Sequence, residues 1–126
     1  MKWIAHRGAS TKALENTKKA FKIALESDYD GIECDIRITK DQQFVVFHDE
    51  TLNRLTPYQG YVNTYDEKTL MAISYKQDVN EKILSLKQLI TLMTEYQKTL
   101  LVEVKDRINE IQAKALELLF SEVSFP

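Results

Sequence analysis

The chain has 126 residues, of which 44% are hydrophobic and 29% are charged, and its formal net charge is −2. This length suits one domain, which usually takes ~100–150 residues, and the near-neutral charge excludes the basic field of a general nucleic-acid-binding or acidic-membrane-binding protein. The single cysteine, Cys34, excludes a disulfide within the chain.

The first predicted elements are a strand and a helix. Lys2–Ala5 is short and apolar, which predicts a buried strand. A helix is predicted to begin at Asn16, whose side chain suits the N-cap position. Apolar residues then recur at helical spacing, at Ala20, Phe21, Ala24 and Leu25. A turn is predicted over Asp28–Gly31, in which Gly31 takes the positive φ that other residues avoid.

A hairpin is predicted next. Ile32–Thr39 alternates, with one apolar face made of Ile32, Cys34, Ile36 and Ile38. Lys40–Gln43 is a four-residue polar loop, and Phe44–His48 is a second strand. Because a parallel return needs a crossover of about a dozen residues, these strands must be antiparallel. The return brings His48 back to the level of Asp35.

Residues Glu50–Leu84 are less regular and are predicted to form an inserted lobe over the mouth of the sheet. Within the lobe, Thr64-Tyr65-Asp66-Glu67 has the form of a capping box, which predicts a short helix. A second capping box, Ser85-Leu86-Lys87-Gln88, predicts a helix with an apolar stripe of Leu86, Leu89, Ile90, Met93 and Tyr96.

The last predicted elements are a strand at Leu100–Lys105, a helix at Arg107–Phe120 and a strand beginning near Val123. The helix is expected to bury a stripe of Ile108, Ile111, Ala115 and Leu118. Strands that alternate with helices predict an α/β fold with parallel strands.

The chain is expected to be cytoplasmic. It has no run of about 18 apolar residues that could form a transmembrane helix. No signal peptide fits a chain whose His6-Arg7 pair begins at the sixth residue. Cys34 lies within an apolar strand, where a buried, unreactive thiol is expected.

Ionisable residues stand at the ends of several predicted strands, an arrangement typical of an active site on a parallel sheet or barrel. Glu33 and Asp35 point to the same side of one strand, and Glu103 and Lys105 share a face of another. Three inward carboxylates repel one another unless a cation lies among them. Oxygen ligands suit Mg²⁺ or Ca²⁺. The alternative is a set of ion pairs in which Arg37 and Lys105 neutralise the acids.

Two histidines, His6 and His48, could act as general acid and base near neutral pH, or they could be structural hydrogen-bonding residues. Arg7 has a planar fork suited to a phosphate that Gly8 would let approach the backbone, or it is a surface arginine. Imidazoles, cations and a carboxylate-held metal together favour cleavage of a phosphate ester. No activated serine or cysteine favours acyl transfer, and glycosidase chemistry would leave the cations unused.

The ordered motifs resemble the N-terminal half of the glycerophosphodiester phosphodiesterase family. The similarity is collinear over about residues 3–105 and is carried by His6-Arg7-Gly8, Glu15-Asn16-Thr17, Gly31-Ile32-Glu33-Cys34-Asp35-Ile36, Thr39-Lys40-Asp41, Val45-Val46-Phe47-His48-Asp49, Leu52-Asn53-Arg54, Thr56, Gly60, Leu86 and Glu103-Val104-Lys105.

This resemblance implies a TIM-barrel type of α/β fold, with a β-hairpin and a small insertion after the second strand. Since a TIM barrel takes ~250 residues, residues 1–126 would be a partial TIM-barrel phosphodiesterase domain. It would contain the first three to four βα units, with residues 50–84 as the inserted lobe.

The resemblance also implies an activity, the metal-dependent hydrolysis of glycerophosphodiesters to glycerol 3-phosphate and an alcohol. It implies that Glu33, Asp35 and Glu103 hold a divalent cation, Mg²⁺ or Ca²⁺. By the same resemblance, the acid–base pair is His6 and His48, the phosphate ligands are Arg7 and Lys105, and the supporting acid is Glu15.

Three hypotheses remain open from the sequence. The first is an active phosphodiesterase acting on a small-molecule glycerophosphodiester, with the barrel completed by a second copy of the chain or by a separate C-terminal half. The second is a truncated half-barrel with little or no activity that serves as a structural or interaction module. The third is a module that binds phosphate without cleaving it.

Overall fold

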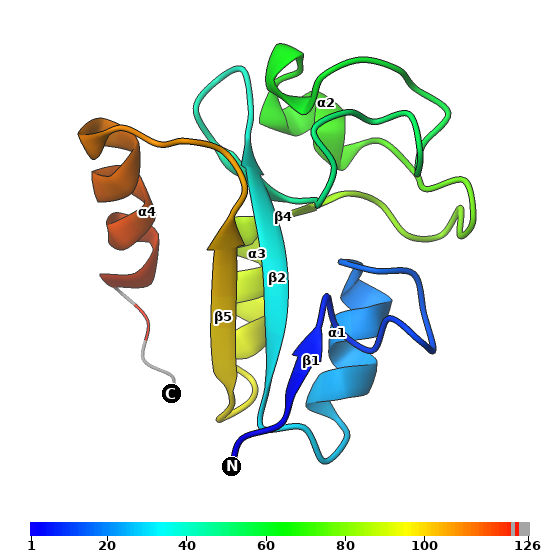
Figure 1. Ribbon diagram of the computed structural model, residues 1–126, viewed down its shortest axis with the longest axis vertical. Coiled ribbons are helices and arrows are strands. Elements are labelled where there is room, and N and C mark those ends of the chain that lie inside the picture. Colours follow the sequence, from blue (N-terminus) through cyan, green and yellow to red (C-terminus); the bar gives the residue numbers. More distant parts are fainter. Residues whose placement is uncertain (122, 124–126) are drawn as a thin grey trace.

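The strands form one mixed sheet around a long central strand (Figure 1). In residues 1–121 and 123, which are those that the computed structural model describes, the sheet has five strands: β1 (Ile4–His6), β2 (Gly31–Ile38), β3 (Phe44–Val46), β4 (Leu84–Ser85) and β5 (Thr99–Val104). Strand β2 pairs in parallel with β1 and β5, and the short β3 pairs antiparallel with both β2 and β4. The predicted α/β fold with parallel strands is confirmed, with end points that move by one or two residues.

Strands β1 and β3 share one edge of β2. Residue Ile36 pairs with β5 on one side and with β3 on the other, so β3 lies on the edge that β1 also occupies. Strand β1 pairs with β2 as far as Glu33, and β3 begins its pairing at Ile36. The end of β1 and the start of the hairpin therefore meet beside the middle of β2.

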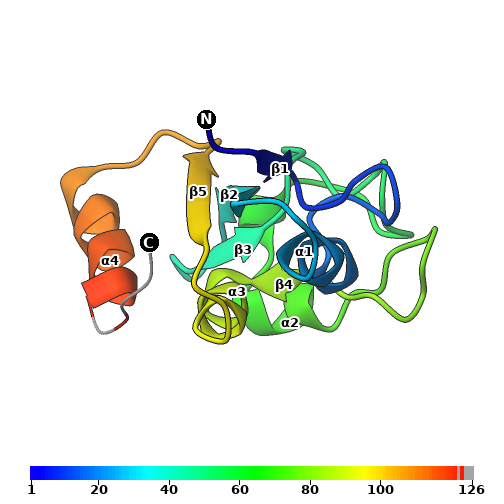
Figure 2. The ribbon, with the colours of Figure 1, turned by 90° about the horizontal axis from the view of Figure 1, so that it is seen from below.

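The helices are α1 (Lys18–Leu25), α2 (Glu67–Met71), α3 (Leu86–Met93) and α4 (Glu110–Ser121), with a 3₁₀ turn, η1, at Val62–Thr64. Helices α1 and α3 lie against one face of the sheet, and α4 lies beside β5 (Figure 2). The other face of β1, β2 and β5 carries no helix in this view. Among the described residues, no helix combines the length and the apolar character that a bilayer-spanning segment needs.

The predicted alternation of β2 is confirmed. Its apolar side chains are buried against the helices, whereas Glu33 and Arg37 on the opposite face are only partly buried. Cys34 is buried on the apolar face, and this burial raises the pKa of its thiol well above the usual value. The antiparallel hairpin is also confirmed, because the Phe47 N–H donates to the Asp35 carbonyl oxygen (2.9 Å).

Two apolar clusters hold the molecule together. The larger lies between the sheet and helices α1 and α3, and it includes Phe21, Leu25, Ile32, Ile36, Leu89 and Met93. The smaller is formed largely by the segment between β3 and β4, and it includes Val45, Phe47, Leu52, Leu70, Tyr75 and Ile83. This segment therefore has a core of its own, which is joined to the sheet through β3.

Two predictions around α1 and β2 were wrong. The N-cap of α1 is Thr17, whose side chain accepts the Ala20 N–H, while Asn16 is buried in a left-handed conformation (φ 56°). Gly31 does not take a positive φ but begins β2, where a Cβ would lie 2.2 Å from the carbonyl oxygen of Thr99. Close approach of β5, and not turn geometry, requires glycine at this position.

The substitution Gly31→Ala is expected to lower the free energy of unfolding by about 3 kcal/mol or more, because the added methyl group meets backbone atoms of β5 that cannot rotate away. Urea denaturation of the two chains measures this difference. An unchanged denaturation midpoint would mean that β2 and β5 do not pair in the register that places Gly31 opposite Thr99.

The two capping boxes had different outcomes. Asp66, not Thr64, caps α2 by accepting the Thr69 N–H, and Thr64 lies in η1. The capping box at Ser85 is confirmed, since Ser85 Oγ accepts the Gln88 N–H and Gln88 Oε1 accepts the Ser85 N–H. Helix α3 ends at Met93, before the predicted stripe is complete.

Helix α4 begins three residues later than predicted, and only half of its predicted stripe packs on the core. Of the predicted stripe, Ile111 and Leu118 are 81% and 62% exposed. The prediction is confirmed for Ile108 and Ala115, which are partly buried and pack on the main core together with Leu116, Leu119 and Phe120. Apolar residues on two sides of this helix made the buried side ambiguous. Apart from Val123 itself, the strand predicted near it lies outside the described residues.

Candidate functional site

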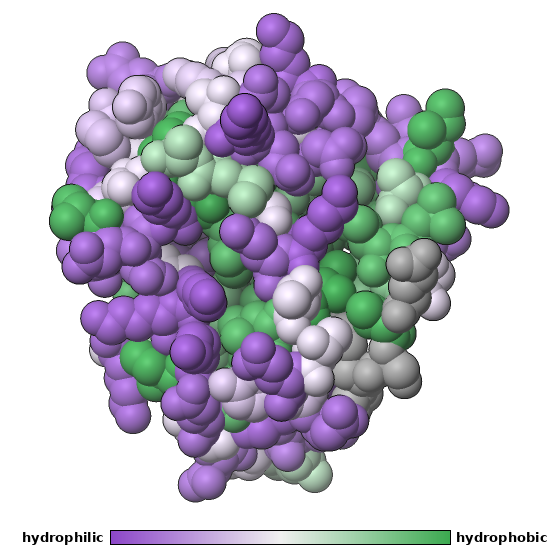
Figure 3. Space-filling view, turned by 180° about the vertical axis from the view of Figure 1, so that it is seen from behind, coloured by the Kyte–Doolittle hydropathy of each residue, from purple (hydrophilic) through white to green (hydrophobic). Residues whose placement is uncertain are grey.

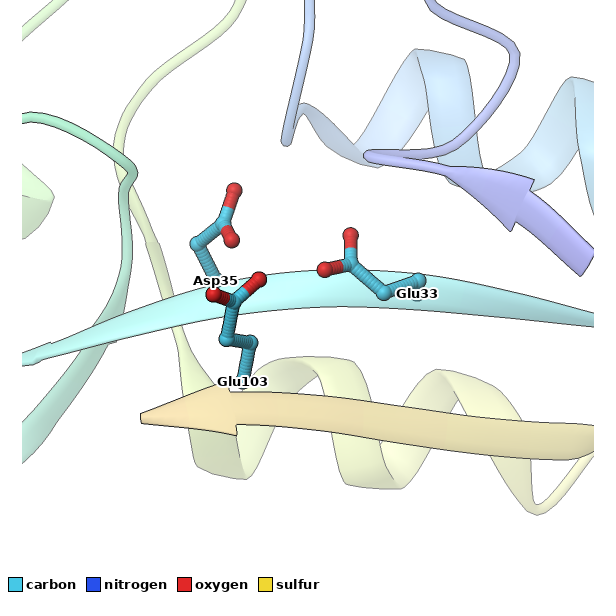
Figure 4. A group of neighbouring side chains, drawn as sticks. All are labelled: Glu33, Asp35 and Glu103. Atoms are coloured by element: carbon cyan, nitrogen blue, oxygen red, sulfur yellow. The ribbon is translucent and has the colours of Figure 1, made fainter. Parts of the chain in front are cut away.

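Three carboxylates converge on the face of the sheet that the helices leave uncovered (Figure 4). Strand β2 presents Glu33 and Asp35 on one side, as its alternation requires. Strand β5 places Glu103 directly beside Asp35 in the parallel register. One oxygen from each carboxylate lies within 4.8 Å of the others. The structure thus brings together the three acids that the sequence singled out.

Asp35 is the fully buried member of this acidic cluster. Its Oδ2 accepts the side-chain N–H of Asn16 (3.0 Å) and lies 3.1 Å from Nε of Arg7. Its Oδ1 is also buried but has no hydrogen-bond partner among the described residues. An unpartnered buried carboxylate oxygen is costly, so a cation at this position would satisfy an otherwise unmet demand. The residues therefore fit a hard divalent ion.

The acids influence one another electrostatically. Burial raises the pKa of Glu33, and the nearby charge of Asp35 raises it further. The Lys105 ammonium lowers the pKa of Glu103, helped by a hydrogen bond with Glu33. Negative charge is thus concentrated where the carboxylate oxygens meet, and a positive ion there would relieve the repulsion.

His6 and Arg7 reach this cluster from the end of β1. His6 pairs with Glu33 across the sheet, and its Nε2 lies 3.9 Å from Glu33 Oε1. Its side chain is 65% exposed, so the ring is accessible. The Arg7 N–H donates to Glu33 (3.2 Å) from a left-handed backbone (φ 57°). Gly8 follows (φ 79°) so close to α1 that a Cβ would lie 2.8 Å from the Ala20 carbonyl carbon.

His48 lies just beyond β3 and is held at both its ring and its backbone. Its Nδ1 lies 2.8 Å from Asp49 Oδ1. Its carbonyl oxygen accepts two N–H groups of Arg37, at 3.0 and 2.7 Å. Arg37 also forms an ion pair with Asp106 (2.9 Å). The alternative in which Arg37 neutralises the acidic cluster is therefore wrong, because its guanidinium is engaged elsewhere.

The remaining predicted site residues form ion pairs. Lys105 Nζ lies 2.9 Å from Glu103 Oε1, as the ion-pair alternative anticipated. Arg7 donates to Glu15 (3.1 Å), and Glu15 is largely buried. Both cations that were predicted to bind phosphate thus lie beside carboxylates of the site and keep further N–H groups for a ligand.

Sequence reasoning assigned no role in the site to three polar residues of this region, Asn16, Asp49 and Arg54. The Asn16 side chain donates its Nδ2–H to Asp35 Oδ2 (3.0 Å), and its Oδ1 accepts the backbone N–H of Asp35 (3.3 Å). Arg54 donates to Glu15 and to Asp49, and it holds the pKa of Asp49 down at about 2, with His48 contributing less. The position of Asp49 directly after His48 in the sequence could have indicated its contact with the imidazole. The contact of Arg54 with Glu15 spans 39 positions, and no local pattern indicates it.

The fold and the site define an α/β protein whose polar site lies at the carboxyl ends of the parallel strands β1 and β5, beside the middle of β2. Barrel enzymes also place their sites at the carboxyl ends of parallel strands. The model of the glycerophosphoryl diester phosphodiesterase family matches residues 6–121. The chain therefore belongs to this family, and the resemblance seen in the sequence is confirmed.

Individual relatives agree with this assignment. The chain is 36% identical to the glycerophosphodiester phosphodiesterase of Caldanaerobacter subterraneus over 117 residues, which are 93% of this chain and 46% of the relative. It is 52% identical to the uncharacterized protein YqiK of Bacillus subtilis over 68 residues, which are 52% of this chain and 28% of the relative. The chain thus spans less than half the length of these two curated relatives.

Solved structures share the fold. The glycerophosphodiester phosphodiesterase of Thermotoga maritima has a TM-score of 0.78 and 31% identity, over 97% of this chain and 50% of that protein. A phosphodiesterase from Oleispira antarctica, in complex with the product sn-glycerol-3-phosphate, has a TM-score of 0.86 and 26% identity. That similarity covers 100% of this chain and 53% of the other. The described elements therefore correspond to about half of each solved enzyme.

Proposed function

We propose that this chain carries the catalytic residues of a divalent-cation-dependent phosphodiesterase that cleaves glycerophosphodiesters to glycerol 3-phosphate and an alcohol. The observation that carries the proposal is the convergence of Glu33, Asp35 and Glu103 within 4.8 Å beside His6. Family membership supports the reaction type, and the Oleispira antarctica enzyme was solved with glycerol 3-phosphate as its product.

In this proposal, Glu33, Asp35 and Glu103 hold Mg²⁺ or Ca²⁺. The donor set is all oxygen, which these ions prefer, and the unpartnered Oδ1 of Asp35 would be one of the ligands. When bound, the cation supplies positive charge against the negative charge that builds on the phosphate oxygens during cleavage.

The two imidazoles are proposed to move the protons. One takes a proton from the attacking oxygen, either a water or the neighbouring glycerol hydroxyl, and the other donates a proton to the leaving alcohol. With Nδ1 of His48 directed at Asp49, the nitrogen that remains for the substrate is Nε2. Arg7 and Lys105 are proposed to bind the phosphate, and Glu15 is proposed to orient Arg7.

The direct test is hydrolysis of a glycerophosphodiester, with enzymatic detection of glycerol 3-phosphate. Product is expected with added Mg²⁺ or Ca²⁺. It is expected to disappear with a chelator and to return when excess cation is restored. Cation-independent release, or release of the phosphorylated alcohol together with glycerol, would contradict the proposal.

Cation affinity is expected to fall as the pH is lowered, starting above the range of an ordinary glutamate, whose pKa is about 4.3. Because the pKa of Glu33 is raised, a proton competes with the cation at a higher pH than usual. Above the pKa of Glu33 the affinity should be constant, and below it the affinity should fall about tenfold per pH unit for one displaced proton. Calorimetric titration with Ca²⁺ at several pH values measures this. Glu33→Gln should bind more weakly with a shallower pH dependence, whereas an identical dependence in both chains would exclude Glu33.

We also propose that the chain is part of a TIM barrel that another polypeptide segment completes. Only β1, β2 and β5 run in parallel in the described part of the chain, whereas a TIM barrel has eight parallel strands. A second copy of the chain would bring the number to six, so a C-terminal half of the barrel fits better than a dimer. Exposed apolar side chains that such a segment could cover are Trp3 before β1 and Ile111 and Leu118 on α4. Figure 3 shows apolar surface on the right of the view, the side of the molecule on which α4 lies.

Mixing the chain with the half of the Caldanaerobacter subterraneus relative that it does not match is expected to give a one-to-one complex. Native mass spectrometry measures the assembly directly, since the chain alone has a mass of 14.7 kDa. Ile111→Glu with Leu118→Glu should weaken the complex without unfolding the chain, because both side chains are already exposed. A stable dimer of the chain that does not bind the second half would contradict the proposed one-to-one complex.

A further inference from the structure

Arg54 lies between two carboxylates that belong to different parts of the site. Its Nε donates to Asp49 Oδ2 (2.7 Å) and its Nη2 to Asp49 Oδ1 (3.0 Å). The same guanidinium donates to Glu15 through Nη1 (3.1 Å) and Nη2 (3.0 Å). A planar fork with several donors can hold two carboxylates in fixed geometry, which a lysine cannot do.

Each of these carboxylates contacts a residue of the proposed reaction. Glu15 accepts an N–H of Arg7 (3.1 Å), and Asp49 Oδ1 lies 2.8 Å from Nδ1 of His48. Arg7, Glu15, Arg54, Asp49 and His48 therefore form one continuous line of neighbouring charged and polar groups. The line joins the end of β1 to the end of β3.

The inserted lobe fixes Arg54 in place. Its neighbours Leu52 and Leu55 are buried in the apolar cluster of the lobe. The turn is closed by the hydroxyl of Thr56, which donates to the Leu52 carbonyl oxygen (2.9 Å), and by the Asn53 side chain, which accepts the Gly60 N–H (3.0 Å). The backbone beside Arg54 is thus anchored on both sides, although the side chain itself is about half exposed.

We infer that Arg54 is a positioning residue, which holds the Asp49 carboxylate so that His48 donates its Nδ1–H to it and presents Nε2 to the substrate. The inserted lobe then contributes to the reaction by supplying this arginine. The inference rests on the proposed function for the role of His48, but the tautomer that it assigns to His48 can be measured without any turnover.

The charge state of Asp49 agrees with this assignment. Like an ordinary aspartate, Asp49 is ionised at neutral pH and can only accept hydrogen bonds. Arg54 and, less strongly, His48 lower its pKa to about 2, so it stays ionised in moderate acid as well. The ring proton of neutral His48 must then lie on Nδ1. This leaves the lone pair of Nε2 available to accept a proton, and the protonated ring can donate one from the same nitrogen.

Nitrogen-15 NMR of the histidine rings tests the inference on the chain as it stands. The chain has two histidines, so a His6→Gln background leaves His48 as the sole signal. At a pH where the ring is neutral, the Nδ1–H tautomer is expected to dominate. In Arg54→Lys and Arg54→Met the populations are expected to shift toward the Nε2–H tautomer. Asp49→Ala serves as the positive control, because it removes the acceptor itself.

The matched negative control is Lys76→Met. Lys76 is an exposed cation of the same lobe, and its ammonium donates to the Asn53 carbonyl oxygen (2.9 Å) without contacting Asp49. It should leave the tautomer unchanged. If Asp49→Ala shifts the tautomer but both folded Arg54 variants keep the original one, Asp49 suffices alone and the inference is overturned.

In an assembly that turns over, Arg54→Lys is expected to lower kcat about 10–100-fold, the usual range for loss of a supporting hydrogen-bonding residue, with cation affinity unchanged. An unchanged kcat would overturn the inference. Absence of turnover in the parent assembly would instead count against the proposed function, while the NMR result would still decide how His48 is held.

Discussion

Replacing Asp35 with asparagine is expected to abolish divalent-cation binding and, with it, the hydrolysis of glycerophosphodiesters. Asparagine keeps the shape of the side chain but removes the charge of the one fully buried carboxylate in the acidic cluster. Asp35 Oδ1 has no protein partner among the described residues, so no neighbouring group there compensates for the lost carboxylate charge. Metal-ion stabilisation of a phosphoryl transition state is worth several kcal/mol, which corresponds to a rate loss of about 10³-fold or more.

Calorimetry and thermal denaturation measure the binding part of this prediction. At about 100 times its dissociation constant, a cation adds about 2.7 kcal/mol to the stability of the folded state, and this increment should vanish in Asp35→Asn. Asp106→Asn is the matched control, because Asp106 pairs with Arg37 outside the acidic cluster. It should retain the increment. Equal binding by Asp35→Asn and the parent chain would remove Asp35 from the site.

The substitutions His6→Ala and His48→Ala are each expected to slow phosphodiester cleavage by about 10²–10⁴-fold, the usual contribution of a general acid or base. Neither ring is one of the three cluster ligands, so cation affinity should stay close to that of the parent chain. His6 is 65% exposed, which makes a loss of stability at that position small.

Single-turnover kinetics with a chromogenic phosphodiester separate this chemical role from binding. If the two histidines act in one concerted step, the double variant should be little slower than either single variant. A parent chain that is no faster than both variants would end the case for catalysis by these two groups.

Much of the acidic cluster could be predicted from the sequence because it depends on local geometry. The period of two along β2 puts Glu33 and Asp35 on the same side, and this holds in any register. To predict that Glu103 joins them, one must further assume that its strand lies parallel to β2 and beside it. The observed register, in which Asp35 and Glu103 are direct neighbours, bears this out.

The errors arose where a distant contact outweighed a local preference. Asn16 has a good N-cap side chain, but the buried carboxylate of Asp35 needs its amide, so the cap moves to Thr17. Gly31 looked like a turn residue, yet the backbone of β5 is what excludes a side chain there. The pairing of Arg54 with Glu15 joins the lobe to the loop after β1, and it depends on how two separate apolar clusters dock. Such a contact becomes visible only in three dimensions.

The shared edge of β2 limits how this protein can vary. Strand β1 stops at His6, opposite Glu33, and the hydrogen bond from Phe47 to Asp35 occupies the next stretch of that edge. Lengthening β1 by two residues would make it compete with the hairpin for the same carbonyl group and displace His48. Redesigned or natural variants should therefore tolerate insertions at the tip of the lobe far better than two added residues in β1. The three-residue length of β1 therefore sets how far the imidazole of His6 lies from that of His48.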